Sequence, residues 1–309
     1  MTTVLRTTDL HLHHRTTRGQ LRAVDGVSLT IERGETLGLV GESGCGKSTL
    51  ARTIVGISRP TGGSLEVAGV EAGRANRFAR ARAVQMVFQD PGGALNPRLS
   101  VERLIEEPLR VHGLGSRAER RAQVLDLAHK VGLSDYHLAR FPHELSGGQR
   151  QRVSIARALA LNPALLVCDE AVSALDVSVQ AQVLNLFIDL QRDLGLTYLF
   201  ISHDLSVVRY IAHRIAVMYL GRIVEIGPAE EVSTRRAHPY TRALVAAIPD
   251  ETVRRPDVPL LEGDVPSPVN PPSGCRFRTR CPLAQARCAV DDPQLRDIGG
   301  GLQVACHFA

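Results

Sequence analysis

The stretch Gly41-Glu42-Ser43-Gly44-Cys45-Gly46-Lys47-Ser48 decides the fold, because it has the form G-x-x-x-x-G-K-S in a strand–loop–helix context. Residues 36–40 before it are short and apolar like a buried parallel strand, and Thr49 begins a run that can propagate a helix. The glycines let successive N–H groups converge on a phosphate, and the helix start adds partial positive charge. In this pattern Lys47 bridges the β- and γ-phosphates and the Ser48 hydroxyl binds Mg²⁺. The sequence therefore predicts a nucleotide site.

Composition restricts what kind of protein surrounds this site. The 309 residues suffice for about two domains with a large core. A hydrophobic content of 44% with 22% charged residues is typical of a globular chain rather than a disordered one. The mild net charge of +5 and the absence of Trp argue against a base-stacking nucleic-acid surface, although a membrane-proximal location would suit them. Residues 1–15 lack the apolar core of a secretory signal, and no apolar stretch is long enough to span a bilayer.

Two further buried strands are followed by polar residues that could act on a bound nucleotide. Residues 164–168 resemble a parallel strand that ends in Asp169-Glu170, and His203 follows a second strand over residues 197–202. Ligands of open α/β sheets bind at the carboxyl ends of such strands. There Asp169 could hold Mg²⁺ through water, Glu170 could polarise the attacking water, and His203 could hydrogen-bond the γ-phosphate. The alternatives are a solvated acidic turn and a structural histidine.

Two other motifs are placed to contact phosphate or metal. Gln89 follows a predicted strand over residues 84–88, where its amide could reach Mg²⁺ or the attacking water. The segment Leu145-Ser146-Gly147-Gly148-Gln149 opens a long helix in which Ser146 is a good N-cap and the two glycines expose bare N–H groups. This predicts a second anion-binding helix start, for which an ordinary capped helix is the alternative.

The remaining pattern divides the chain into a core of residues 1–248 and a tail of residues 249–309. Apolar residues at helical spacing from about 90 to 145 predict a helical insertion between two parts of an α/β core. We expect β-rich segments over residues 5–40, 61–88 and 216–225. Six prolines between residues 256 and 272 indicate an extended linker that leads to a small cysteine-bearing tail.

Together these motifs resemble the ATP-binding subunit of an ABC transporter, and the resemblance covers nearly the whole chain. It implies a P-loop ATPase core of the α/β class with an antiparallel β subdomain. The motif assignments that it implies are Walker A at residues 41–48, the Q-loop Gln89, the signature at residues 145–149, Walker B with the catalytic Glu170, the D-loop ending in Asp176, and the switch His203.

Finer features resemble the oligopeptide/dipeptide importers, nearest their second ATPase subunit (the DppF/OppF type). These features are FQDP at residues 88–91, LNPR at 95–98, DVSVQAQ at 176–182, HPYT at 238–241 and the proline-rich start of the tail at 266–275. The implied function is ATP hydrolysis with Mg²⁺ that drives uptake of di- or oligopeptides across the cytoplasmic membrane. Nickel and oligosaccharide importers share much of the pattern and remain alternatives. Two more distant alternatives are a soluble ABC ATPase that acts on nucleic acid and a redox protein with a vestigial ATPase.

The resemblance also implies partners. Two ATPase subunits, either this chain with a paralogue or two copies, would pair head to tail. Each ATP would then lie between the Walker A of one subunit and the signature of the other, with Ser146 and Gly148 on the γ-phosphate held by the partner. The expected assembly also contains two transmembrane permease subunits and an extracytoplasmic solute-binding protein. The ATPase subunits would lie at the cytoplasmic face of the membrane, and no nucleic-acid partner is expected. Conformational changes would pass through the Gln89 region and the helical insertion.

Three positions depart from the family pattern. Ala171 stands where the family usually has Pro after the catalytic Glu, and Gly92-Gly93 replaces a bulkier pair near the expected permease contact. The adenine-stacking residue is usually Tyr or Phe. Its nearest counterpart here is His14, a weaker stacking partner.

The six cysteines fall into two groups. Cys45 and Cys168 occupy positions where a small thiol suffices. The other four, in the spacing C-x5-C-x6-C-x17-C, could hold Zn²⁺ or an iron–sulfur cluster, or could bind no metal. The spacing lacks the paired CxxC of a zinc ribbon, whereas four nearby arginines would suit an anionic cluster. The family resemblance implies a [4Fe-4S] centre on Cys275, Cys281, Cys288 and Cys306. His307, next to Cys306, is an alternative candidate ligand.

Overall fold

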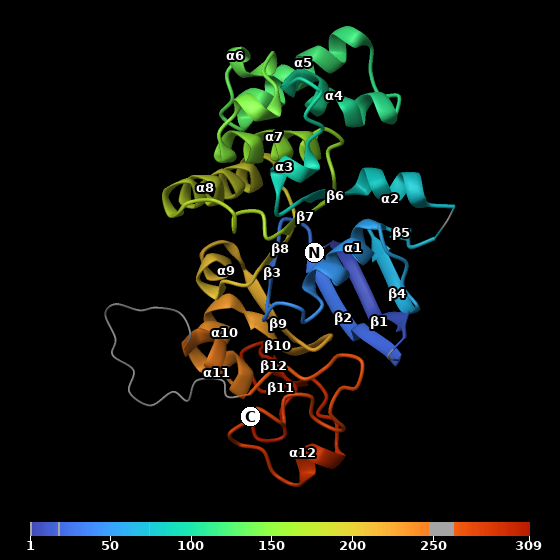
Figure 1. The fold of residues 1–309 in the computed structure, drawn as a ribbon, viewed down its shortest axis with the longest axis vertical. Coiled ribbons are helices and arrows are strands. Elements are labelled where there is room, and N and C mark those ends of the chain that lie inside the picture. Colours follow the sequence, from blue (N-terminus) through green and yellow to red (C-terminus); the bar gives the residue numbers. More distant parts are fainter. Residues whose placement is uncertain (1, 18, 74, 247–262) are drawn as a thin grey trace.

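The larger of two β-sheets contains the strands whose ends are predicted to form the nucleotide site (Figure 1). The computed structural model describes residues 2–17, 19–73, 75–246 and 263–309. Four parallel strands of this sheet are β3 (Thr36–Val40), β8 (Tyr198–Ser202), β7 (Leu165–Asp169) and β6 (Val84–Val87), in that spatial order. The first three of them are buried at every residue, as expected for a sheet covered on both faces. These strands confirm the predicted positions to within one or two residues.

The sheet continues on the other side of β3. Strand β9 (Arg214–Tyr219) pairs parallel with β3, and β10 (Arg222–Pro228) returns antiparallel to β9. This hairpin accounts for the β-rich segment predicted over residues 216–225. Two short strands of the tail, β12 (Gln303–Val304) and β11 (Arg296–Asp297), then extend the same sheet beyond β10. The described part of the tail therefore completes the core sheet.

A smaller antiparallel sheet, formed by the N-terminal part of the chain, packs against the core. Its strands are β1 (Thr3–Thr16), β2 (Gly19–Glu32), β4 (Gly62–Val67) and β5 (Val70–Glu71), in the order β2-β1-β4-β5. The segment 61–88, expected to be β-rich, also contains the helix α2 (Arg77–Ala83), which the prediction missed. Arg80 explains this helix, because its buried guanidinium donates to the carbonyl of Thr53 (3.0 Å), a contact distant in sequence.

The expected helical insertion is present and forms the end of the molecule farthest from the tail (Figure 1). It comprises α3 (Pro91–Ala94), α4 (Val101–Val111), α5 (Arg117–Lys130), α6 (Asp135–Leu138) and the 3-10 turn η1 (Pro142–Glu144). Apolar residues of α4 and α5 pack into one core with α7 (Gly147–Leu159). The other helices are α1 (Lys47–Val55), α8 (Val177–Leu194), α9 (Leu205–Ile211), α10 (Ala229–Arg235), α11 (Pro239–Ala246) and α12 (Arg287–Val290). In the described part of the chain, none of these helices is long and apolar enough to cross a bilayer.

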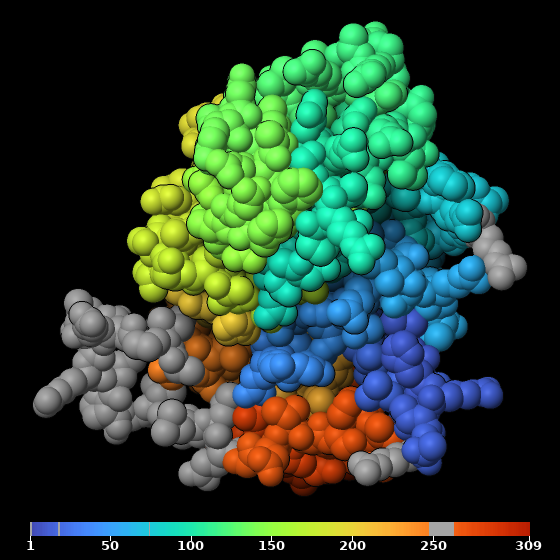
Figure 2. All heavy atoms as spheres, turned by 45° about the horizontal axis from the view of Figure 1, so that its top comes forward, coloured from blue at the N-terminus to red at the C-terminus, as the bar shows by residue number. Residues whose placement is uncertain are grey.

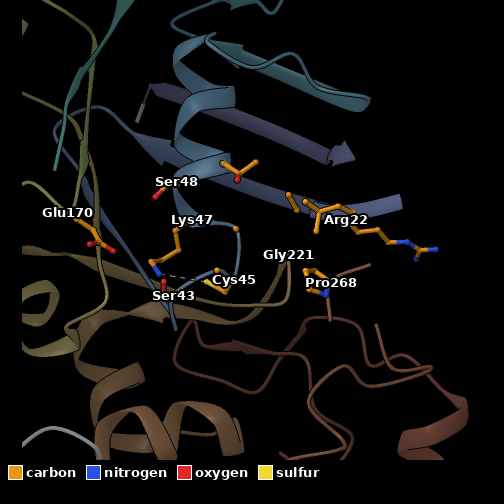
Figure 3. A pocket seen from close by; sticks show the side chains of 13 residues that line it. Arg22, Ser43, Cys45, Lys47, Ser48, Glu170, Gly221 and Pro268 are labelled. Atoms are coloured by element: carbon orange, nitrogen blue, oxygen red, sulfur yellow. Dashed lines mark hydrogen bonds between the residues drawn. The ribbon is translucent and has the colours of Figure 1, made fainter. Parts of the chain in front are cut away.

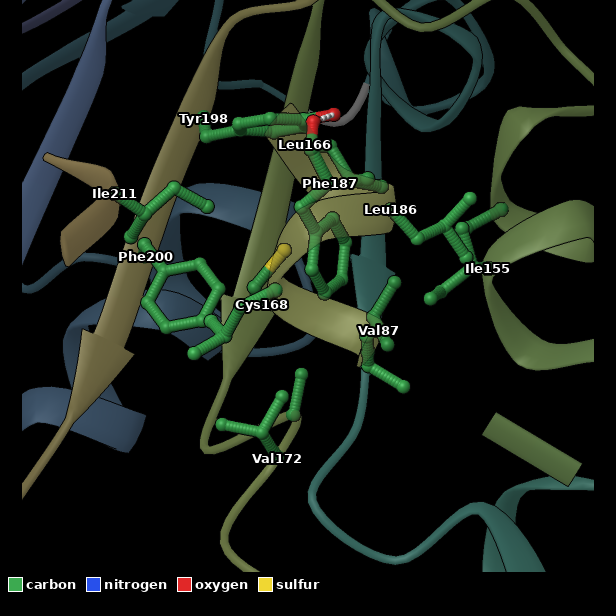
Figure 4. Close-up of a cluster of buried hydrophobic side chains, with 14 of the residues drawn as sticks. Val87, Ile155, Leu166, Cys168, Val172, Leu186, Phe187, Tyr198, Phe200 and Ile211 are labelled. Carbon is green, nitrogen blue, oxygen red and sulfur yellow. Dashed lines mark hydrogen bonds between the residues drawn. The ribbon is translucent and has the colours of Figure 1, made fainter. Parts of the chain in front are cut away.

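Aromatic packing holds α8 against the parallel strands (Figure 4). The Phe187 ring of α8 meets the rings of Tyr198 and Phe200 edge to face, each at 5.7 Å between centroids. The Tyr198 hydroxyl donates to the carbonyl of Phe187 (3.0 Å). Such contacts add to the burial of these large side chains and fix α8 on strand β8.

A second aromatic group joins the tail to the core. Phe277 of the tail is buried against Tyr219 and Tyr240, with ring centroids 5.2 and 5.4 Å away. Figure 2 shows the C-terminal residues, in orange and red, lying directly against the blue N-terminal part of the chain. The start of the predicted linker, with Pro256 and Pro259, lies outside the described residues.

His238 is a buried titratable residue beside this aromatic group. Its Nδ1 accepts a hydrogen bond from the backbone N–H of Tyr240 (3.1 Å), which requires a neutral ring. Burial lowers the pKa of His238 to about 3. In the unfolded chain the imidazole protonates near its ordinary value, so the unfolded state binds more protons between the two pKa values.

We expect this difference to make the protein less stable as the pH falls below about 6.5. Between pH 7 and pH 5 the His238 contribution to the free energy of unfolding should fall by about 2 kcal/mol. Urea unfolding of the wild type and of His238→Gln at both pH values measures this contribution. The variant should show a smaller pH dependence, and equal slopes would contradict the prediction.

Candidate nucleotide-binding site

The phosphate-binding loop lies between β3 and α1, as the sequence predicts. Gly46 precedes α1 with φ 112°, a left-handed conformation that disfavours any residue with a side chain. A Cβ added at Gly46 would lie 2.1 Å from the carbonyl oxygen of Ala23, so only glycine fits between the loop and β2. The backbone N–H groups at the start of α1 have no partner within the helix and are available to an anion.

Lys47 is held inside the loop. Its side chain is buried, and Nζ donates to the carbonyl oxygens of Gly41 (2.7 Å) and Glu42 (3.0 Å). The Sγ of Cys45 lies 3.9 Å from the same nitrogen, and burial raises the pKa of this thiol. Cys45 is therefore a neutral packing residue, as predicted, and Lys47 carries the positive charge of the loop.

Ser48 and Asp169, which the sequence predicts to bind magnesium, lie together beside the phosphate-binding loop. The Ser48 hydroxyl donates to Oδ1 of Asp169 over 3.0 Å, although 121 residues separate them. Burial raises the pKa of Asp169, and the hydrogen bond from Ser48 opposes that effect. A hydroxyl and a carboxylate at this separation are oxygen ligands of the kind that Mg²⁺ prefers. The residues present therefore fit the ion.

Glu170 and His203 face one another at the same sheet edge. Nδ1 of His203 lies 3.5 Å from a carboxylate oxygen of Glu170, and the Glu170 side chain is the more buried of the two. Glu170 has φ 50°, so it is one of the few non-glycine residues in the left-handed region. Such strain is found at functional positions, where the surrounding structure compensates for it. Ala171, where the family usually has Pro, is buried in the turn that follows.

The parallel register explains why these residues meet. Val40 pairs with Ser202, Asp169 with Ile201, and Val87 with Cys168, so the strands end side by side. Gln89 leaves β6 at this edge and is exposed.

The structure places a pocket over the loop and shows walls that the motifs did not indicate (Figure 3). Residues 43–49 and Glu170 line one part of it. Residues 21–23, Gly221 and Pro268 line the rest. His14, the expected adenine-stacking residue, is not in this lining. It is exposed, and its register partner Leu21 lies in the pocket wall instead. The extra walls are distant in sequence, so no local pattern identifies them.

The signature residues form a separate helix start. Ser146 caps α7 by accepting from the N–H of Gln149 (3.2 Å), whose side chain accepts from the Ser146 N–H (2.9 Å). Residues 146–149 are not part of the pocket lining around Lys47. Asp176 likewise caps α8, with Oδ1 accepting from the N–H of Val179 (3.0 Å). The two helix starts that the sequence predicts to bind phosphate, those of α1 and α7, therefore do not line one pocket.

The predicted iron–sulfur centre receives no support. Among the described residues, no three of the tail cysteines bring their sulfur atoms within 4.8 Å of one another. Burial raises the pKa of Cys275 to about 11, and Nε2 of His307 lies 3.0 Å from the carbonyl oxygen of Asp291. The arginines thought to suit an anionic cluster have other partners, which are Asp25 for Arg276, Ser273 for Arg278, Glu42 for Arg280 and Asp291 for Arg287.

A parallel sheet with a phosphate-binding loop, a Mg²⁺-type Ser–Asp pair and a Glu–His pair at one edge defines a P-loop ATPase. Residues 24–173 match the family model described as ABC transporter, and residues 224–288 match the one described as oligopeptide/dipeptide transporter, C-terminal region. The chain belongs to the oligopeptide/dipeptide family of ABC transporter ATP-binding proteins.

Relatives and solved structures agree with this assignment. The di/tripeptide transport ATP-binding protein DppF of Pseudomonas aeruginosa is 49% identical, over 100% of this chain and 98% of that protein. A probable peptide ABC transporter ATP-binding protein of Sinorhizobium fredii is 55% identical, over 93% and 82%. The ATP-binding cassette MJ0796, solved as a dimer after hydrolysis with ADP and Pi, has a TM-score of 0.66 and 28% identity, covering 73% of this chain and 98% of that one.

Proposed function

We propose that this chain is the ATP-hydrolysing subunit of an importer for di- or oligopeptides, and that its residues act as follows. The observation that carries the proposal is the meeting of Lys47, the Ser48–Asp169 pair and the Glu170–His203 pair at one sheet edge. The C-terminal family match and the relatives that are named for peptide transport support the solute class.

The phosphates of ATP would bind to the loop N–H groups and Lys47, which would exchange its carbonyl contacts for phosphate oxygens. Ser48 and Asp169 would hold Mg²⁺, with Gln89 near it, and the ion would supply positive charge to the phosphate oxygens. Glu170 would accept a proton from the attacking water. The oxygen of that water would bond to the γ-phosphorus as the bond between this phosphorus and the β–γ bridging oxygen breaks. His203 would orient Glu170 and donate to the γ-phosphate.

The position of the signature helix outside the pocket implies that a complete ATP site requires two ATPase subunits. In this proposal Ser146, Gly147, Gly148 and Gln149 contact the γ-phosphate bound by another ATPase subunit, because they lie outside this chain's own pocket. ATPases of this family pair with one another and act on membrane permease partners. The extracytoplasmic solute-binding protein and the location at the cytoplasmic face belong to the proposal.

Reconstitution with the permease partners tests the solute class. ATP hydrolysis in proteoliposomes should rise when a solute-binding protein loaded with di- or oligopeptide is added, and labelled peptide should accumulate. The Glu170→Gln complex serves as the control without transport. Stimulation by nickel or oligosaccharide and not by peptide would overturn the assigned solute while leaving the ATPase assignment in place.

A further inference from the structure

The tail contributes an ion pair to the phosphate-binding loop. Both terminal nitrogens of Arg280 donate to the two carboxylate oxygens of Glu42, over 2.7 and 3.1 Å. The Arg280 side chain is only 5% exposed, whereas that of Glu42 is 25% exposed. A bidentate pair of this kind, largely shielded from water, is stronger and more directional than a surface salt bridge.

Glu42 connects this pair to the lysine of the loop. Its carbonyl oxygen accepts from Nζ of Lys47 (3.0 Å), and its backbone N–H donates to the hydroxyl of Tyr240 (2.7 Å). The side chain, the carbonyl and the N–H of this one residue are thus each held. Two of the three partners come from the C-terminal part of the chain, so the loop conformation depends on that part.

The same segment of the tail has two other attachments to the pocket. Arg276, four residues earlier, is buried and binds both Asp25 of β2 and the carbonyl of Leu220 beside Gly221. Pro268 lines the pocket itself, and its carbonyl accepts from the N–H of Arg22 (3.1 Å), another lining residue. Figure 3 shows Pro268 and Arg22 at the same end of the pocket.

We propose that three tail residues, Pro268, Arg276 and Arg280, are structural parts of the ATP site, in which Arg280 positions the phosphate-binding loop through Glu42. Pro268 with Arg22 forms a pocket wall that the ATPase core alone does not supply. The proposal rests on the nucleotide site described under the proposed function. It makes Arg280 a positioning residue, since it contacts Glu42 rather than the pocket.

Nucleotide affinity of the full chain tests this role. Arg280→Gln should raise the Kd for a fluorescent ATP analogue with Mg²⁺ about tenfold, because the loop loses its bidentate anchor. Arg278→Gln is the matched control. Arg278 lies in the same turn and is half-buried, and its guanidinium donates to Ser273 rather than to the phosphate-binding loop. Its Kd should equal that of the wild type.

A double-mutant cycle separates this role from a merely structural one. Glu42→Gln should weaken binding to a similar degree, and the Glu42→Gln/Arg280→Gln variant should be no weaker than either single variant. In hydrolysis assays Arg280→Gln should raise KM much more than it lowers kcat. Glu42→Gln leaves the tail residues intact, so it also provides the test if Arg280→Gln does not fold.

Four outcomes would count against the proposal. Unchanged Kd in Arg280→Gln, or independent additive effects of the two substitutions, would overturn the proposal while the ATPase assignment stands. Loss of affinity in Arg278→Gln equal to that in Arg280→Gln would also overturn it. Absence of ATP binding by the wild type would refute the nucleotide site and this proposal together.

Discussion

Glu170→Gln is expected to bind ATP almost as the wild type does and to lose hydrolysis by a factor of about 10² to 10⁴. The substitution keeps the size of the side chain but removes the oxygen that would accept a proton from water. Lys47, Ser48 and Asp169, which would hold the phosphates and Mg²⁺, keep their contacts. Binding of a fluorescent ATP analogue and steady-state phosphate release measure the two effects separately.

Glu230→Gln is a suitable control because Glu230 is an exposed residue of α10, outside the pocket lining. It should match the wild type in both assays. Undiminished hydrolysis by Glu170→Gln would refute the role assigned to Glu170. Lost nucleotide binding would show instead that this carboxylate holds the site together.

The second large effect concerns the composite site. Lys47→Ala and Ser146→Arg should each reduce hydrolysis by two copies of this chain at least about a hundredfold, because one disables the loop and the other the signature. Mixed in equal amounts, they should recover about a quarter of the wild-type rate, since half of the dimers then hold one intact site of two.

Lys47→Ala mixed with Glu170→Gln is the matched control for this experiment. Both substitutions lie in the same half of the site, so no dimer in that mixture contains an intact pair of halves, and no activity should return. Sedimentation of the mixtures confirms the dimer population. Recovery in both mixtures, or full-rate turnover by chains verified as monomers, would contradict a site built from two subunits.

The phosphate-binding loop and the strand ends were predictable because their signals are local. A tight glycine turn between β3 and α1 needs its residue types at fixed spacing, and this spacing is visible in residues 41–48 without any tertiary contact. The buried strand before Asp169-Glu170 is likewise an uninterrupted apolar run. Their convergence followed from one rule, that parallel strands expose their carboxyl ends at one edge.

The same local reasoning failed where distant residues decide the outcome. Helix α2 is anchored by buried Arg80 on the carbonyl of Thr53, which no pattern within 61–88 reveals. The tail arginines resembled partners for an anionic cluster, because a sequence shows charges but not the carboxylates that face them. In the folded chain Arg276 lies against Asp25 and Arg280 against Glu42.

The sequence by itself determined that this chain binds and hydrolyses a nucleoside triphosphate as an ABC transporter subunit, because the chemistry resides in short motifs with fixed spacing. Only the tertiary structure decided what surrounds them. It placed Pro268 in the pocket wall, the signature outside the chain's own site, and the tail on the loop through Arg280. The Glu42–Arg280 pairing alone spans 238 residues. Contacts of this kind form only when the whole core packs, so no local pattern in the sequence reveals them.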